Sequence, residues 1–243
     1  MEACVASVSD HDMIVNLGDI VGYGASPNEV SDRSRELCDI FVRGNHDKAC
    51  TGLAGIDDFN PIAGMAALWT QQTLTPENLE WLRALPQGPI ELDHIWPQES
   101  ENSNHAKVQC VHGSPLDEDE YITSRADAEN IYDYLDSALT FFGHTHLQGG
   151  FLWANGHQEA IQRPGPRQHQ VHLRLDRDGV YLLNPGSVGQ PRDGDPRAAY
   201  ALYDTESREV TFRRVQYDAF KVRQRIEAAG LPAILGDRLL LGR

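Results

Sequence analysis

The feature that most constrains this chain is a repeated pattern, in which a short apolar run leads into residues that can bind a metal ion. Short apolar runs that end in turn signals predict buried strands. In an open α/β sheet, residues just beyond the carboxyl ends of parallel strands meet in one crevice. The runs are Met13–Leu17, Asp39–Val42, Lys107–Val111 and Leu139–Phe142, and the residues that follow them are Asp19, Asn45, His112, His144 and His146.

These side chains have compatible chemistry. One carboxylate, one amide and three imidazoles, without a thiolate, suit Mn, Fe, Zn or Co better than calcium or a soft metal. Each segment alone has a more ordinary explanation, because Gly18-Asp19 could be a turn, Asn45 could begin a helix and His112 could be structural. Their occurrence together, in this order, favours a metal site.

The remaining pattern predicts one α/β domain over residues 1–243, with two sheets flanked by helices. The expected helices are Pro27–Leu37, residues 60–72 and 76–85, a segment near Ser124–Leu135, the tail Asp218–Ala229, and the end of another helix in residues 2–9. The expected later strands are Gln170–Leu175, Val180–Asn184, Ala198–Asp204 and Glu209–Val215, with a hairpin at Asp178-Gly179 between the first two. Residues 97–105 and 154–169 are polar and are expected to form loops.

The composition excludes several classes of protein. A formal net charge of −15 argues against a surface that binds duplex nucleic acid through Lys and Arg. No apolar run approaches the roughly 18–20 residues of a membrane helix, and the N-terminus lacks the pattern of a signal peptide. We therefore expect a cytoplasmic protein without a membrane partner. Its four widely spaced cysteines are expected to be free thiols, at Cys4, Cys38, Cys50 and Cys110.

Five motifs resemble those of the calcineurin-like metallophosphoesterase family, most closely its bacterial branch of small enzymes labelled diadenosine-tetraphosphatase-like. They are LGDIVGYG (17–24), RGNHD (43–47), VHGSP (111–115), FGHTH (142–146) and NPGSVGQPR (184–192). The resemblance covers nearly the whole chain and implies a four-layer α/β/β/α sandwich. It also implies hydrolysis of phosphate mono- or diesters, on small phosphoesters or nucleotides, by a hydroxide that two divalent metal ions activate.

The resemblance further implies a role for each motif residue. His46 would protonate the leaving oxygen, and Asp47 would orient the His46 ring or cap a helix. The implied metal ligands are Asp19 as the bridge between the ions, Asn45, His112 and His144 in one site, and His146 in the other.

Four more residues are candidates for substrate contact. Arg43 and Arg192 carry guanidinium groups that match phosphate geometry, although surface ion pairs would also explain them. Tyr23, in the glycine-flanked loop after the first motif strand, is a candidate for lining the pocket. Ser187 belongs to a turn whose backbone N–H groups could bind a phosphate, and a plain turn is the alternative.

The family's first motif, Asp-x-His-Gly-Asn at the end of a buried strand, does not occur in this sequence. Asp10–Asp12 are poor substitutes, because they precede the strand that Asp19 follows, which places them about 17–23 Å away. The second metal site would then have only Asp19 and His146, and would bind its ion weakly. We expect the natural chain to begin upstream of Met1, and a sheet without that strand to keep an unpaired edge.

Two other functions stay open from the sequence. A non-catalytic phospholigand-binding or scaffold protein could have kept the pocket and one metal site, and its metal content would distinguish it from an enzyme. A nuclease of the same fold is the other alternative. The acidic charge speaks against duplex binding, and a salt-insensitive response to small phosphodiesters would exclude it.

Overall fold

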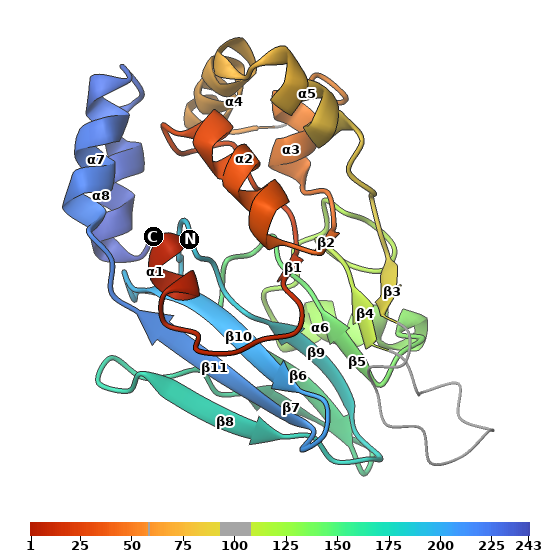
Figure 1. Ribbon diagram of the computed structural model, residues 1–243. Coiled ribbons are helices and arrows are strands. Elements are labelled where there is room, and N and C mark those ends of the chain that lie inside the picture. The colour runs from red at the N-terminus through yellow and green to blue at the C-terminus, as the bar shows by residue number, and fades with distance from the viewer. Residues whose placement is uncertain (58, 93–107) are drawn as a thin grey trace.

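Two β layers pack face to face in the computed structural model, which describes residues 1–57, 59–92 and 108–243 (Figure 1). One layer is a six-stranded mixed sheet with the order β3-β4-β5-β9-β6-β7. The other contains a parallel pair, β1-β2, and an antiparallel sheet with the order β10-β11-β8. The strands are β1 (Val15–Asn16), β2 (Ile40–Phe41), β3 (Ile90–Leu92), β4 (Val108–Cys110), β5 (Leu139–Phe141), β6 (Gly149–Ala154), β7 (His157–Ile161), β8 (Gln170–Arg174), β9 (Val180–Asn184), β10 (Ala198–Asp204) and β11 (Glu209–Val215).

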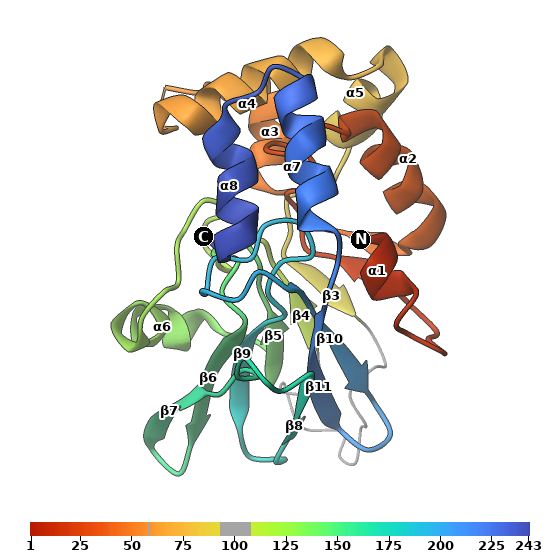
Figure 2. The ribbon, with the colours of Figure 1, turned by 90° about the vertical axis from the view of Figure 1, so that its left-hand side faces the viewer.

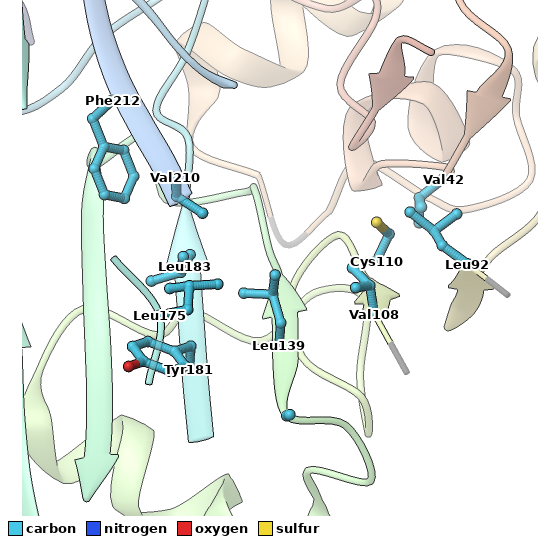
Figure 3. Packing of buried hydrophobic residues seen from close by; sticks show 11 residues of the cluster. Val42, Leu92, Val108, Cys110, Leu139, Leu175, Tyr181, Leu183, Val210 and Phe212 are labelled. Carbon is cyan, nitrogen blue, oxygen red and sulfur yellow. The ribbon is translucent and has the colours of Figure 1, made fainter. Parts of the chain in front are cut away.

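The main core lies between these two layers. Leu139 and Leu183 from the six-stranded sheet pack in one cluster with Val210 and Phe212 from β11, and all four are fully buried (Figure 3). Val42, directly after β2, joins the same cluster, so both parts of the second layer contact the first. Burying such large apolar side chains is the main favourable term in folding, at about 1.5–3 kcal/mol for each.

Helices cover the outer faces and complete the layer order α/β/β/α. Ile131 of α6 packs with Trp153 on the outer face of the six-stranded sheet. On the other side, Val30 of α2 and Trp81 of α5 pack with Phe41 of β2. Helices α7 and α8 lie side by side next to α4 (Figure 2). The helices are α1 (Glu2–Val5), α2 (Pro27–Leu37), α3 (Asn45–Cys50), α4 (Pro61–Thr73), α5 (Pro76–Arg83), α6 (Arg125–Ile131), α7 (Ala219–Ala228) and α8 (Ala233–Leu241).

Local signals account for several helix starts. The side chains of Asn60, Thr75 and Asp218 each accept a hydrogen bond from a backbone N–H three residues later, which caps α4, α5 and α7. Proline occupies the first helical position of α2, α4 and α5, where its missing N–H is not needed. In the described residues, no helix is both long enough and apolar enough to cross a membrane. All four cysteines are free thiols, as predicted.

The predicted hairpin at Asp178-Gly179 is wrong. Strand β8 pairs with β11, whereas β9 pairs with β5 and β6, so the turn links the two layers. The burial patterns explain this, because β8 alternates between exposed and half-buried positions, as suits a sheet edge. Strand β9 is buried at four consecutive positions, as suits the centre of a covered sheet.

Several elements were not anticipated, among them the short strand β3. Residues 154–169, expected to be a loop, contain β7, a polar strand at the edge of the six-stranded sheet. Strand β6 and helix α8 were not predicted either. The polar segment 97–105 lies outside the described residues.

A buried polar network joins the two layers close to the carboxyl ends of the strands. The Gln148 amide donates hydrogen bonds to the backbone oxygens of Pro185, Tyr200 and Arg213. Its side-chain oxygen accepts from the Arg214 guanidinium, which also pairs with Asp193, and both of these charged side chains are fully buried. The network holds the loop after β9 against β6 and β11.

Replacing Asp193 with Asn should lower the free energy of unfolding by about 3–5 kcal/mol, because the buried Arg214 charge then loses its carboxylate. Urea unfolding at pH 7 measures the change. Asp178→Asn is the control, because Asp178 is exposed and should change stability by less than about 0.5 kcal/mol. Equal stability of the two variants would show that the buried pair does not stabilise the fold.

Candidate metal centre

The carboxyl ends of four parallel strands bring four predicted ligands together. Asp19, Asn45, His112 and His144 follow β1, β2, β4 and β5, in which the pairs β1-β2 and β4-β5 run parallel. The Nε2 atom of His112 lies 3.4 Å from Oδ1 of Asp19, 3.3 Å from Oδ1 of Asn45 and 3.2 Å from Nδ1 of His144. One ligand atom each from Asp19, His112 and His144 lies within 4.8 Å of the others.

The hydrogen bonds of His112 show that this cluster suits a cation. Its Nδ1 lies 2.6 Å from the carbonyl oxygen of Leu17, so Nδ1 carries the proton and donates it. Its Nε2 therefore presents a lone pair towards the oxygens of Asp19 and Asn45. Among the described residues, Nε2 of the buried His144 has no hydrogen-bond partner. Lone pairs that converge without a proton between them repel each other, and a metal ion relieves that repulsion.

His146 lies on the other side of the Asp19 carboxylate. Its Nδ1 donates a hydrogen bond of 2.7 Å to the carbonyl oxygen of Gln190, which leaves Nε2 free of a proton. That Nε2 is 3.7 Å from Oδ2 of Asp19. The two oxygens of Asp19 thus face different imidazoles, Oδ1 towards His112 and Oδ2 towards His146.

The backbone at these positions is held in an unusual conformation. Asp19, His144 and His146 have φ angles of 54°, 58° and 59°, in the left-handed region that side chains other than glycine seldom adopt. The Asn184 amide donates to the carbonyl oxygen of Gly143 and to Oγ1 of Thr145, which fixes the loop that carries both histidines. Strain of this kind is concentrated at functional sites.

Gly44 allows the loops after β1 and β2 to approach closely. A Cβ atom at this position would lie 2.2 Å from the backbone nitrogen of Asp19 and 2.3 Å from its Oδ1. The glycine of the RGNHD motif is therefore required for steric reasons. It also brings the backbone N–H of His46 within 3.0 Å of Oδ1 of Asp19, to which it donates a hydrogen bond.

The electrostatics leave the cluster in the protonation state that a divalent cation needs. Burial opposes ionisation of Asp19, but the neighbouring His112, His46 and His146 outweigh it and hold the Asp19 pKa well below its usual value. Burial lowers the pKa of His144 to about 3 and also lowers that of His146. The carboxylate is thus ionised and these imidazoles are neutral near pH 7.

His46 lies beside the cluster, between two aromatic rings. Its ring centroid is 4.3 Å from that of Tyr23 and 4.9 Å from that of Phe59. In the part of the chain that the structure describes, its buried Nδ1 has no hydrogen-bond partner. Asp47 does not hydrogen-bond this ring. Its two carboxylate oxygens accept from the backbone N–H groups of Val21 and Gly44, so Asp47 joins the two motif loops and caps α3. Burial and the charge of Asp19 raise the Asp47 pKa.

The predicted substrate residues have different environments. Arg43 forms an ion pair with the buried Glu118, which Lys48 also contacts, so its guanidinium is already engaged. The Ser187 hydroxyl accepts from the backbone N–H groups of Gly189 and Gln190, within its own turn. Tyr23 and Arg192 lie at the cluster, with the Arg192 guanidinium 5.5 Å from the centre of the Tyr23 ring.

Several residues near the cluster, Gln190 and Tyr121 among them, were not predicted as site residues. Gln190 contributes a backbone carbonyl to His146, a role that no side-chain pattern can reveal. The ring centroid of Tyr121 lies 3.8 Å from that of His144. Tyr121 follows the acidic segment 117–120, and no motif there indicates a contact with the site. Asp10, His11 and Asp12 are exposed and lie outside the cluster of possible ligands, in agreement with the argument against them.

Comparison with known proteins decides the family. Residues 1–208 match the calcineurin-like phosphoesterase superfamily domain. The chain belongs to this superfamily. The family accounts for the cluster, because it implies divalent metal ions, and the fit of the donor atoms described above agrees with it.

Relatives of this metallophosphoesterase chain extend over most of its length. It is 38% identical over 229 residues to the uncharacterized protein MJ0912 of Methanocaldococcus jannaschii, covering 93% of this chain and 85% of that protein. A metallophosphoesterase from Sphaerobacter thermophilus is 37% identical, with a TM-score of 0.79 over 100% of this chain and 93% of the other. PH1004 from Pyrococcus horikoshii, 20% identical, shares the fold with a TM-score of 0.67 over 94% and 84% of the two chains.

Replacing Gly44 with Ala should weaken the binding of Mn²⁺ or Zn²⁺ at least tenfold, because the new Cβ displaces the Asp19 carboxylate. Disturbing the groups that orient metal ligands typically lowers affinity by about 10–100-fold. Calorimetric titration with the metal measures the affinity. Gly24→Ala is the matched control, since no heavy atom of the described residues lies within 4 Å of its added Cβ. Equal affinity in the two variants would show that the contact between Gly44 and Asp19 does not shape the site.

Proposed function

We propose that this chain hydrolyses phosphate mono- or diesters of small molecules, with two divalent cations held at Asp19, Asn45, His112, His144 and His146. The observation that carries the proposal is the position of Asp19, whose two oxygens face His112 and His146 separately. When bound, cations at such a site supply a hydroxide at neutral pH and neutralise charge on the phosphoryl oxygens. Manganese is the first metal to test, because oxygen and imidazole ligands suit it.

The protein groups of the cluster would position the reacting phosphate. Asp19 contributes a full negative charge, because its pKa lies well below the usual value. His112 and His146 each donate their Nδ1 proton to a backbone carbonyl, so their rings cannot turn away from the cluster. Fixed groups of this kind need little reorganisation during the reaction, which is where much catalytic power originates.

In this proposal, His46 protonates the leaving oxygen. Burial lowers the pKa of His46 to about 4, so the free protein holds a neutral imidazole. The negative charge of an arriving phosphate favours the protonated form and opposes this shift. The Tyr23 and Phe59 rings hold the imidazole in place, since no described residue forms a hydrogen bond with its Nδ1.

Arg192 is the residue we assign to the equatorial phosphate oxygens. Its guanidinium lies over Tyr23, and its positive charge contributes to lowering the pKa of His46, His144 and His146. Its backbone N–H donates to the carbonyl oxygen of His146, which ties it to the cluster. Arg43 is the weaker candidate, because Glu118 already neutralises it.

The net charge and the free cysteines of the chain bear on its substrates and its cellular location. A net charge of −15 disfavours duplex nucleic acid, so we propose small phosphoesters or nucleotides as substrates. Four free thiols suit a reducing compartment, and we therefore propose a cytoplasmic location.

His46→Ala should lower kcat on an aryl phosphate ester with added Mn²⁺ by about 10²–10⁴-fold, the usual contribution of an acid–base residue. Asn45→Ala should lower activity through weaker metal binding, so extra Mn²⁺ should restore part of it. His157→Ala is the control, because His157 is exposed on the edge strand β7. Release of the aryl alcohol is followed by absorbance.

Activity of His46→Ala equal to that of the His157→Ala control would contradict the assigned acid. Absence of hydrolysis in the unmodified chain, with only one metal ion bound by elemental analysis, would favour a phospholigand-binding protein instead of an enzyme.

A further inference from the structure

The ring of Tyr23 lies between the metal centre and helix α8. The Tyr23 ring contacts the ring of His46, with 4.3 Å between the two ring centroids. Two guanidinium groups also lie over this ring, with the Arg192 carbon 5.5 Å and the Arg238 carbon 5.9 Å from the ring centre. Arg238 belongs to α8, so an element far away in the sequence places a cation beside the candidate site.

Neither guanidinium has an acidic side chain as its partner within the described residues. Arg192 donates to the side-chain oxygen of Gln190, at 3.1 and 3.2 Å. Arg238 donates through Nε to the backbone oxygen of Arg243, at 3.0 Å. By contrast, Arg197 and Arg214 are paired with carboxylates. In a chain with a net charge of −15, two neighbouring guanidinium groups that have no acidic side chain as a partner among the described residues are unexpected.

The two positive charges repel each other. Burial lowers the Arg238 pKa, and the nearby charge of Arg192 lowers it further. Contact with the electron-rich face of Tyr23 compensates only part of this cost. An anion placed between two guanidinium groups would remove the repulsion and form charge-assisted hydrogen bonds with both.

Helix α8 is held firmly against the loop that carries Arg192. The backbone N–H of Gly194 donates to the carbonyl oxygen of Gly242, just after the helix, at 2.9 Å. The buried residues Leu235 and Leu239 of α8 pack in one cluster that also includes Tyr23. Figure 2 shows α8 descending beside α7 towards this loop. The position of Arg238 is therefore set by packing on both sides.

We propose that Arg192 and Arg238 form a second anion-binding subsite, which takes a negatively charged group of the substrate beyond the reacting phosphate. The inference rests on the proposed function, because it assumes that a phosphate reacts beside His46. The preferred substrates are then phosphoesters whose leaving group carries a further phosphate or a carboxylate. Arg238 is the residue that confers this preference, because Arg192 is also assigned to the reacting phosphate.

The first test measures binding without activity. The chain is treated with chelator, dialysed, and titrated calorimetrically with methylenebisphosphonate or with methylphosphonate, which has only one anionic group. The unmodified chain should bind methylenebisphosphonate more tightly than methylphosphonate. Arg238→Gln should reduce this preference about tenfold or more, the usual effect of losing a hydrogen bond between charged groups. Arg238→Lys, which keeps the charge without the planar fork, should recover part of it.

Arg225→Gln is the matched control, because it removes the same charge from an exposed position on the neighbouring helix α7. Thermal unfolding of each variant shows whether the loss of the Arg238 contact with Arg243 has disturbed the fold. Equal loss of preference in Arg225→Gln and Arg238→Gln would overturn the subsite, since a general charge effect would then explain it.

The second test uses competition against aryl phosphate hydrolysis. The ratio of the inhibition constants for bisphosphonate and methylphosphonate should rise about tenfold in Arg238→Gln. Phosphonoacetate carries a carboxylate in place of the second phosphonate. If Arg238→Gln loses more affinity for phosphonoacetate than for the bisphosphonate, the subsite prefers a carboxylate, and the reverse result indicates a phosphate. An unchanged ratio would overturn the subsite. Absence of hydrolysis in every variant would contradict the proposed function alone, because the calorimetric test still decides the subsite.

Discussion

The buried, ionised carboxylate of Asp19 is the group on which the arrangement of this site depends. It accepts a hydrogen bond from the backbone of His46 and faces His112 and His146 with different oxygens. Its backbone has the left-handed conformation, and the neighbouring loop passes so close to it that only glycine fits at position 44. The position of the Asp19 carboxylate and the close packing of the two loops therefore depend on each other.

The strands that carry the ligands could be predicted from the sequence, and so could their meeting point. Apolar runs that end in polar residues mark strand ends, and parallel strands align those ends, so Asp19, His112 and His144 had to be neighbours. The bounds of the last two strands, β10 and β11, also match the predicted ranges Ala198–Asp204 and Glu209–Val215.

Other features depend on contacts that a single sequence does not display. Asp178-Gly179 marks a turn, but the pairing of β8 and β9 depends on burial in two different sheets. Asp47 was expected to orient the His46 ring, yet it binds backbone N–H groups, because the adjacent loops expose those donors to it. Arg238 could not be connected with the site, since its position follows from the docking of α8 rather than from any local motif.

The way the turn after β8 links the two layers has a consequence for folding. Strand β8 pairs with β11, which follows it much later in the sequence, whereas β9 pairs with β5, which precedes it. Each layer is thus assembled from segments that interrupt the other, and neither layer is a continuous piece of chain. Such non-local pairing raises the entropic barrier to folding, because long loops must close before the strands are stabilised. The metal cluster takes its ligands from loops after strands of both layers, so it is complete only when the two layers have packed together.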